Sequence, residues 1–196
     1  MSEDLIPIPS QTVGPYFRIG LAGSRATQQI APPGVQGERV RLVVMAFDLE
    51  DEPIHDCLIE IWQANADGKY NHPDDTQDKP IDPAFRGFGR QATDQNGVCS
   101  FETIKPGCVP GPRGTLQAPH LAVSVFARGM LNRLPTRIYF EGDPANDADP
   151  ILALVPKQRR GTLLAKLVGA ESAGESGAWQ FTIRFGGDRE TVFFDV

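Results

Sequence analysis

The chain has 196 residues, and its 19 Lys and Arg against 25 Asp and Glu give a formal net charge of −6. This charge balance argues against a nucleic-acid-binding protein, which presents a basic surface. The length is sufficient for one domain whose hydrophobic core needs neither a metal nor disulfides to fold. The 20 glycines and 17 prolines indicate many turns and few long helices.

The residues 1–37 predict an irregular N-terminal arm. Turn signals at 12–17 (TVGPYF) and 31–34 (APPG) interrupt this segment, and only 21–30 (LAGSRATQQI) favours a short helix. From residue 38 the sequence changes to short β-rich runs, and neither a repeat nor a linker divides the remainder of the chain. We therefore predict a single domain over 38–196, preceded by an arm over 1–37.

β-rich runs separated by turn residues predict an all-β fold, with the strands arranged as a sandwich with long loops. The expected strands cover residues 38–49, 57–64, 98–104, 120–128, 136–142, 162–170, 179–186 and 190–196. In the run 179–186, apolar residues alternate with polar ones, which predicts one buried face and one face in water. In 41–47 both parities are apolar, so we expect this strand to be covered on both faces or to lie at a subunit contact.

Two long stretches, 65–97 and 105–119, are polar and rich in glycine and proline. Long connections of this kind in compact domains are usually functional or disordered. The segment 149–161 favours a short helix with a basic end.

The cysteines Cys57, Cys99 and Cys108 are an odd number without the paired spacing of a zinc site. They predict free thiols in a reducing compartment. The N-terminal sequence has no basic segment followed by an apolar one, and no window reaches the about 18 apolar residues of a membrane span. We therefore expect a cytoplasmic protein that does not contact a membrane.

Motifs for phosphate binding, the serine nucleophile elbow and the common zinc sites are absent from the sequence. Nucleotide-binding and hydrolase functions are therefore disfavoured. Tyr70 ends the segment WQANADGKY, where a strand runs into an Asp-Gly turn, and His120 opens a strand. A phenol at such a turn either points into a site or covers the turn, and a lone histidine is more often structural than catalytic. The residues alone leave these alternatives open.

Four segments carry a resemblance to a known family: IEIWQANADGKY (59–70), DPAFRGFGRQATDQNGVCSFETIKPG (82–107), APHLAVSVFARG (118–129) and TRIYFEGD (136–143). Their order and content resemble the intradiol ring-cleaving dioxygenases, and the resemblance extends from PSQTVGPYF (9–17) to the C-terminal ETVFFDV. It implies a β-sandwich and non-haem ferric iron chemistry, in which O2 opens an aromatic ring between two hydroxyl-bearing carbons.

The resemblance also implies where a metal would be bound. In iron-bearing members, two tyrosines and two histidines hold iron(III), which prefers hard oxygen ligands. Tyr70 matches the first tyrosine and His120 the first histidine, whereas Val109 and Ala122 stand at the other two ligand positions. We call Tyr70, Val109, His120 and Ala122 the four ligand positions. Their composition implies a vestigial site, with no metal and no catalytic residue in this chain alone.

The segments 9–17 and 124–129 resemble the iron-free subunit of the two-subunit members of the family. This implies a hetero-oligomer in which a homologous beta subunit holds Fe(III). The implied substrates are O2 and 3,4-dihydroxybenzoate, and the implied product is 3-carboxy-cis,cis-muconate. This chain would contribute residues to the partner's substrate pocket while being inactive in isolation.

We predict that the segment 12–16 of the arm reaches the partner's site instead of packing on its own sandwich, and that Arg128 binds the substrate carboxylate. A guanidinium presents a planar fork that matches a carboxylate. Arg133 and Arg137 are the alternative anion contacts. The predicted substrate-binding residues are Thr12, Gly14, Pro15, Tyr16 and Arg128.

Two other interpretations stay open. In one, the chain is a self-sufficient ferric catechol-type dioxygenase, which the missing donors at Val109 and Ala122 argue against. In the other, it is a non-enzymatic β-sandwich binding module, for which structural roles of Tyr70 and His120 suffice.

Overall fold

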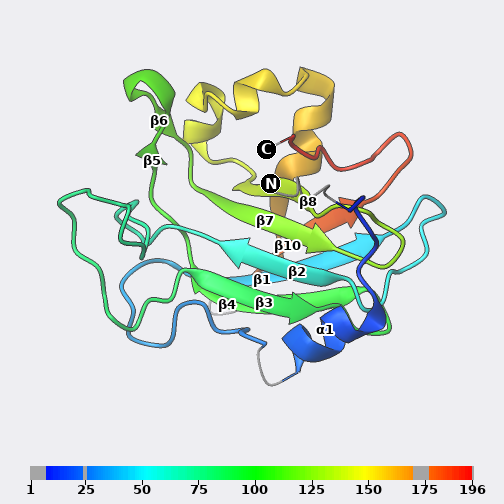
Figure 1. Ribbon diagram of the computed structural model, residues 1–196. Helices are drawn as coiled ribbons and strands as arrows, with labels where there is room; N and C mark the ends of the chain where they lie inside the picture. The colour runs from blue at the N-terminus through cyan, green and yellow to red at the C-terminus, as the bar shows by residue number, and fades with distance from the viewer. Residues whose placement is uncertain (1–7, 24–25, 170–176, 196) are drawn as a thin grey trace, which may run out of the picture.

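The computed structural model describes residues 8–23, 26–169 and 177–195 (Figure 1). Eight strands form a sheet of order β3-β2-β7-β8-β9-β10-β1-β4, and β5 and β6 form a separate two-stranded sheet. The larger sheet contains β1 (Arg39–Phe47), β2 (Leu58–Trp62), β3 (Phe88–Ala92), β4 (Val98–Ile104), β7 (His120–Phe126), β8 (Leu134–Phe140), β9 (Leu164–Val168) and β10 (Ala178–Arg184). The smaller sheet contains β5 (Val109–Pro110) and β6 (Leu116–Gln117). The prediction of an all-β fold is confirmed.

The core lies between the two halves of the larger sheet, which are joined through β9. Alternate residues of β1 are buried, beginning with Val40 and Leu42. They belong to the same hydrophobic cluster as Ile61 of β2 and Val123 of β7, which lie in the other half of the sheet. The period of two along each strand therefore sends one set of side chains inward and leaves the other set on an outer face.

The outer face of the half that contains β7 and β8 is partly covered by 3-10 helices. These are η2 (Pro144–Ala148), η3 (Leu152–Leu154) and η4 (Lys157–Leu163), drawn in yellow and orange above β7 and β8 (Figure 1). With Ala118 and Tyr139 they form a second small hydrophobic cluster, to which Leu152, Val155 and Leu163 contribute. The short helix expected within 149–161 is thus present as two 3-10 helices, separated at Pro156.

Helix α1 (Pro15–Ala22) begins earlier than the helix predicted over 21–30, and that prediction is wrong. Proline is well suited to the first helical turn, because its missing N–H has no partner there anyway. Beyond residues 24–25, which lie outside the described residues, the chain is extended and forms bridges from Thr27 to Arg90 and from Gln29 to Glu102. Tertiary pairing therefore overrides the local helix preference.

The described part of the predicted arm has two kinds of packing. Helix α1 lies at the bottom of the view beside β3 (Figure 1). Further along, Ile30 and Ala31 are fully buried in the main core. The domain boundary at residue 38 stays a prediction.

Strand β3 is absent from the predicted strands, because its sequence FGRQA lies inside the long polar stretch 65–97 and does not alternate. It forms the edge of the sheet beside β2. Gly89 is required at its centre, since an added Cβ would lie 2.7 Å from Cγ1 of Ile30. A glycine that weakens the strand signal is therefore the residue that permits close packing.

The strand expected over 190–196 is absent from residues 190–195, and that prediction is wrong. The backbone N–H of Thr191 donates to Arg184 O (3.0 Å), whereas that of Phe194 donates to Pro135 O (2.8 Å). The segment crosses from β10 to β8, so it cannot keep the regular pairing of one strand.

The expectation that both faces of 41–47 are covered is not met within the chain: of the outward residues of β1, Arg41 is exposed and Val43, Met45 and Phe47 are half-buried. The alternative, that this face lies at a subunit contact, stays a prediction. The alternation predicted for 179–186 is confirmed, with Phe181 and Ile183 buried and Thr182 partly exposed. Among the described residues, no helix combines the length and the apolar character needed to cross a membrane.

Candidate functional site

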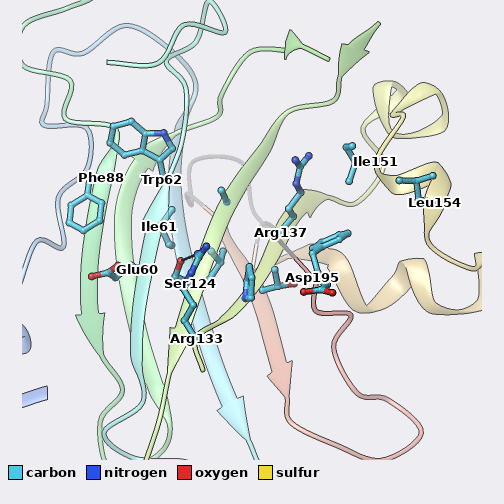
Figure 2. A pocket seen from close by; sticks show the side chains of 15 residues that line it. Glu60, Ile61, Trp62, Phe88, Ser124, Arg133, Arg137, Ile151, Leu154 and Asp195 are labelled. Carbon is cyan, nitrogen blue, oxygen red and sulfur yellow. Dashed lines mark hydrogen bonds between the residues drawn. The ribbon is translucent and has the colours of Figure 1, made fainter. Parts of the chain in front are cut away.

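A pocket lies on the outer face of strands β2, β7 and β8. The register places Ala122 of β7 opposite both Trp62 of β2 and Arg137 of β8. Because the alanine between them is small, the two large side chains border a depression. The pocket has a volume of about 500 Å³. Figure 2 shows Trp62 at one side of it, Ile151 and Leu154 at the other, and Arg137 between them.

His120 begins β7 on the same outer face, under the 3-10 helices. It is only 4% exposed, its Nδ1 lies 2.8 Å from the carbonyl oxygen of Ala118, and its ring packs against Tyr139. Burial, reinforced by the positive charge of Arg137, lowers the pKa of His120 to about 4. The imidazole is therefore neutral at pH 7. Its burial and contacts are those of a histidine with a structural role, which is one of the alternatives that the sequence left open.

Tyr70 stacks on Trp62, with ring centroids 6.1 Å apart and planes inclined by 3°. Its backbone N–H donates to Oδ2 of Asp75 at 2.8 Å. Burial raises the pKa of the Tyr70 phenol, Asp75 raises it further, and Arg137 acts in the opposite direction. Tyr70 and Val109 line a shallow depression next to the pocket, so the turn does present this phenol to a concave surface.

Arg137 is the residue that connects the four ligand positions. Its Nη1 donates to Oε1 of Gln117 at 2.6 Å, and Gln117 pairs with Val109 across the small β5–β6 sheet. The same guanidinium acts electrostatically on Tyr70 and His120. A fixed positive charge therefore lies among the four ligand positions.

The donors present do not fit a ferric centre. Val109 and Ala122 offer no ligand atom, so of the four ligand positions only Tyr70 and His120 carry a donor side chain. The described residues contain no group of three or more His, Cys, Asp and Glu placed to hold a metal ion. Iron(III) prefers several hard oxygen and imidazole ligands, and a guanidinium beside them adds electrostatic repulsion.

A buried carboxylate fixes the 3-10 helices over this site. Asp149 is fully buried and accepts hydrogen bonds from the backbone N–H of Ala118 (2.7 Å), Ile151 (2.9 Å) and Leu152 (2.6 Å). The hydroxyl of Tyr139 donates to it at 3.1 Å. Burial raises the pKa of the Tyr139 phenol, which keeps it a donor. Nothing in the sequence around Asp149 distinguishes it from the other acidic residues of its loop.

The predicted substrate-binding residues gather elsewhere, beyond the end of β7. Nε of Arg128 lies 2.9 Å from Oδ2 of Asp56, and the Arg128 side chain is 53% exposed. The backbone N–H of Gly129 donates to Oγ1 of Thr12 at 2.7 Å. This bond places the arm directly beside Arg128, although more than a hundred residues separate them in sequence.

The part of the arm that follows Thr12 is held by an aromatic contact and by helix α1. Phe17 packs on Phe126 of β7 with ring centroids 5.2 Å apart. Gly14 caps α1, Pro15 begins it, and Tyr16 is 83% exposed. Because Thr12 is bonded to Gly129 beyond the end of β7, the expectation that the segment 12–16 avoids its own sandwich is wrong for the isolated chain. Its reach toward a partner stays a prediction.

The two groups of residues lie at opposite ends of β7. A strand rises about 3.3 Å per residue, so the two ends of β7, His120 and Phe126, are separated by roughly 20 Å, and Arg128 follows two residues after Phe126. Arg133 and Arg137 belong to the pocket near β7, where Nη1 of Arg133 donates to Oγ of Ser124 at 3.0 Å (Figure 2). The sequence did not indicate that Arg128 lies apart from the pocket that Arg133 and Arg137 line, because the three arginines are close to one another in the chain.

Comparisons with known proteins agree with this architecture. A family model described as "Dioxygenase" matches residues 13–187. The chain is 39% identical to the protocatechuate 3,4-dioxygenase alpha chain of Pseudomonas putida over 100% of both chains. It is 37% identical to the protocatechuate 3,4-dioxygenase beta chain of Burkholderia cepacia, over 75% of this chain and 64% of the relative.

Among solved structures, the dioxygenase domain of a dioxygenase carbohydrate-binding protein fusion from Streptomyces sp. SirexAA-E superimposes with a TM-score of 0.60. It is 25% identical, and the superposition covers 91% of this chain and 97% of that one. The family match over most of the sequence and the full-length similarity to an alpha chain lead to one conclusion: the chain belongs to the intradiol dioxygenase family.

Proposed function

We propose that this chain is the alpha subunit of a protocatechuate 3,4-dioxygenase. A homologous beta subunit would hold Fe(III), and the assembled enzyme would cleave 3,4-dihydroxybenzoate with O2 to 3-carboxy-cis,cis-muconate. The observation that carries the proposal is the similarity to an alpha chain over the whole length of both proteins, whereas the beta-chain match covers 75% of this chain. Donors missing at Val109 and Ala122 support the same assignment.

In this proposal, the chain contributes through the surface formed by Arg128 and the arm. The guanidinium of Arg128 is half-exposed, so it can reach a carboxylate that lies outside its own sheet. Protocatechuate carries a carboxylate that catechol lacks, and a guanidinium binds it in a bidentate manner. The exposed phenol of Tyr16 and the open space around Gly14 leave this surface free to line a neighbouring pocket.

The finer expectations depend on this assignment. The hetero-oligomer would be a non-haem iron enzyme of the β-ketoadipate pathway of aromatic catabolism, in the cytoplasm. All of them require the partner subunit.

The first experiment compares the chain purified alone with the chain co-expressed with a candidate beta subunit. Alone, it should contain no stoichiometric iron and should not cleave protocatechuate. The pair should contain iron, show the blue to red colour of tyrosinate-to-iron charge transfer, and be active. A one-to-one iron content with this colour in the isolated chain would favour the self-sufficient dioxygenase. No association with a beta subunit would favour the binding module.

The second experiment tests the arm. Deleting residues 1–17 should lower the activity of the assembled enzyme, because Thr12 and Tyr16 are lost, while deleting residues 1–7 should have little effect. Size-exclusion chromatography shows whether both truncated chains still assemble. Unchanged kinetics in an intact assembly that lacks residues 1–17 would contradict a role of the arm in the substrate pocket.

A further inference from the structure

The pocket on the outer face of β2, β7 and β8 contains two cations without a carboxylate partner among the described residues. Arg133 donates to Ser124 Oγ, and Arg137 donates to Gln117 Oε1 and lies 3.4 Å from the Tyr139 hydroxyl. Neither arginine takes part in any of the ion pairs of the described chain. Both line the same pocket, so its electrostatic field favours an anion.

The acidic residues at this pocket do not cancel that field. Glu60 is paired with Arg90, whose Nε donates to Glu60 Oε1 at 2.6 Å. Asp195 also lines the pocket, but its side chain is exposed, so water screens its charge. Arg137, in contrast, is partly buried, so its interaction with an anion is screened less.

The walls of the pocket are suited to a flat apolar group. Trp62 and Phe88 stand at one side, and Ile151 and Leu154 at the other (Figure 2). Leu154 is 78% exposed, so the wall that it forms with Ile151 is open to solvent and accessible to a ligand. The volume of about 500 Å³ lies within the roughly 300–1,000 Å³ typical of small-molecule pockets.

The floor of the pocket offers no ligand atom for a metal. Ala122 is small and has no donor, and Arg137 stands opposite it in the register of β7 and β8. The cation that recognises an anion here is thus a guanidinium carried by the chain itself.

We propose that this pocket binds a small aromatic carboxylate without a metal ion. The carboxylate pairs with Arg137, aided by Arg133, and the ring lies between Trp62 and the wall of Ile151 and Leu154. This site is separate from the Arg128 surface, and it does not depend on the function proposed above or on a partner subunit.

The test uses intrinsic fluorescence of the full chain titrated with benzoate. The chain has two tryptophans: Trp62 borders the pocket, and Trp179 packs edge-on against Phe140. Benzoate should change the fluorescence in a saturable manner, and Trp62→Phe should abolish the change. Benzamide, which has the same shape but no charge, should bind much more weakly. If benzamide and benzoate bind equally, or neither saturates, the proposal is wrong.

Substitutions of single arginines show which of them contributes to the binding free energy of benzoate. Arg137→Gln should weaken benzoate binding by roughly tenfold or more, because a charge-assisted hydrogen bond is lost. Arg137→Lys should give an intermediate affinity. Arg41→Gln is the matched control, since Arg41 is an exposed arginine on β1 in the other half of the sheet, and it should leave the affinity unchanged. Equal weakening by Arg41→Gln and Arg137→Gln would show a non-specific charge effect and overturn the proposal.

A second variant covers the case in which Arg137→Gln unfolds the chain. Ala122→Leu keeps every charge and fills the floor between Trp62 and Arg137, so it should block benzoate while thermal melting shows a folded protein. Full benzoate affinity in a folded Ala122→Leu chain would overturn the proposal. If the chain is obtained only with a partner, the same titration is made on the complex, and Trp62→Phe again identifies the signal of this chain.

Discussion

The two ends of strand β7 show contrasting ways in which a chain can treat residues of functional type. At the His120 end, the neutral side chains of His120 and Tyr139 are buried in contact with each other, and Asp149 and Arg137 are hydrogen-bonded to Tyr139. At the Arg128 end, the half-exposed guanidinium pairs with Asp56, and Thr12 of the arm is bonded to the adjacent Gly129. Buried networks stabilise a fold, whereas exposed charged groups remain available to a ligand. The first end should therefore respond to mutation in stability, and the second in kinetics.

The largest effect is expected at the buried end, from Asp149. Asp149→Ala leaves three backbone N–H donors and the Tyr139 hydroxyl without their acceptor. Buried unpaired groups cost about 1–3 kcal/mol each before relaxation, so the free energy of unfolding should fall by about 3–5 kcal/mol. Urea unfolding measures this loss. Asp147→Ala is the matched control, since Asp147 is exposed in the same segment, and an equal loss in both variants would contradict the network.

The next effect is a pH dependence of stability from His120. Its pKa is about 4 in the folded chain and 6.5 as the reference value, so between these values the unfolded chain binds more protons. Stability must then fall as the pH decreases from about 6.5 to 4, by roughly 3 kcal/mol from this group. The difference between wild type and His120→Asn should show this dependence in urea unfolding at several pH values. The exposed His72 is the control, and a His72→Asn curve that differs in the same way would contradict the assignment.

At the other end, Arg128→Ala should act on substrate binding. A charge-assisted hydrogen bond contributes about 1.5–3 kcal/mol, so KM for protocatechuate in the assembled enzyme should rise by roughly ten- to a hundredfold. Iron content should not change. Arg133→Ala and Arg137→Ala, made separately, test the alternative anion contacts. An unchanged KM in Arg128→Ala, together with an increase in one of the others, would show that the assignment is wrong.

The smallest effect is a difference in thiol reactivity, which distinguishes buried from accessible positions. Burial raises the pKa of Cys57, and it raises that of Cys99 to about 12. Neither thiolate forms at pH 8, and both side chains are buried, whereas Cys108 is partly exposed. A thiol reagent should label one cysteine rapidly in the native chain and all three in denaturant. Rapid labelling of more than one native thiol would contradict the burial of Cys57 and Cys99.

Much of the fold could be predicted from local patterns. Alternation along 179–186 identified a strand with one buried face, because the period of side chains in a strand is a property of the backbone itself. Prediction failed where long-range packing decided the outcome. The glycine at position 89 weakens the sequence pattern of strand β3, and it is needed there because Ile30 packs against its backbone. Residues 26–30 are extended because they pair with β3 and β4.

For the sites, the sequence by itself determined which donors exist. It has a valine at 109 and an alanine at 122, and no folding can supply the oxygen or nitrogen ligands that these residues lack. Only the tertiary structure decided what stands beside them. Strand register sets Arg137 opposite Ala122, and a hydrogen bond across most of the chain sets Thr12 beside Gly129. Side-chain chemistry is local to each residue, whereas electrostatic neighbours depend on which distant strands and loops pack together.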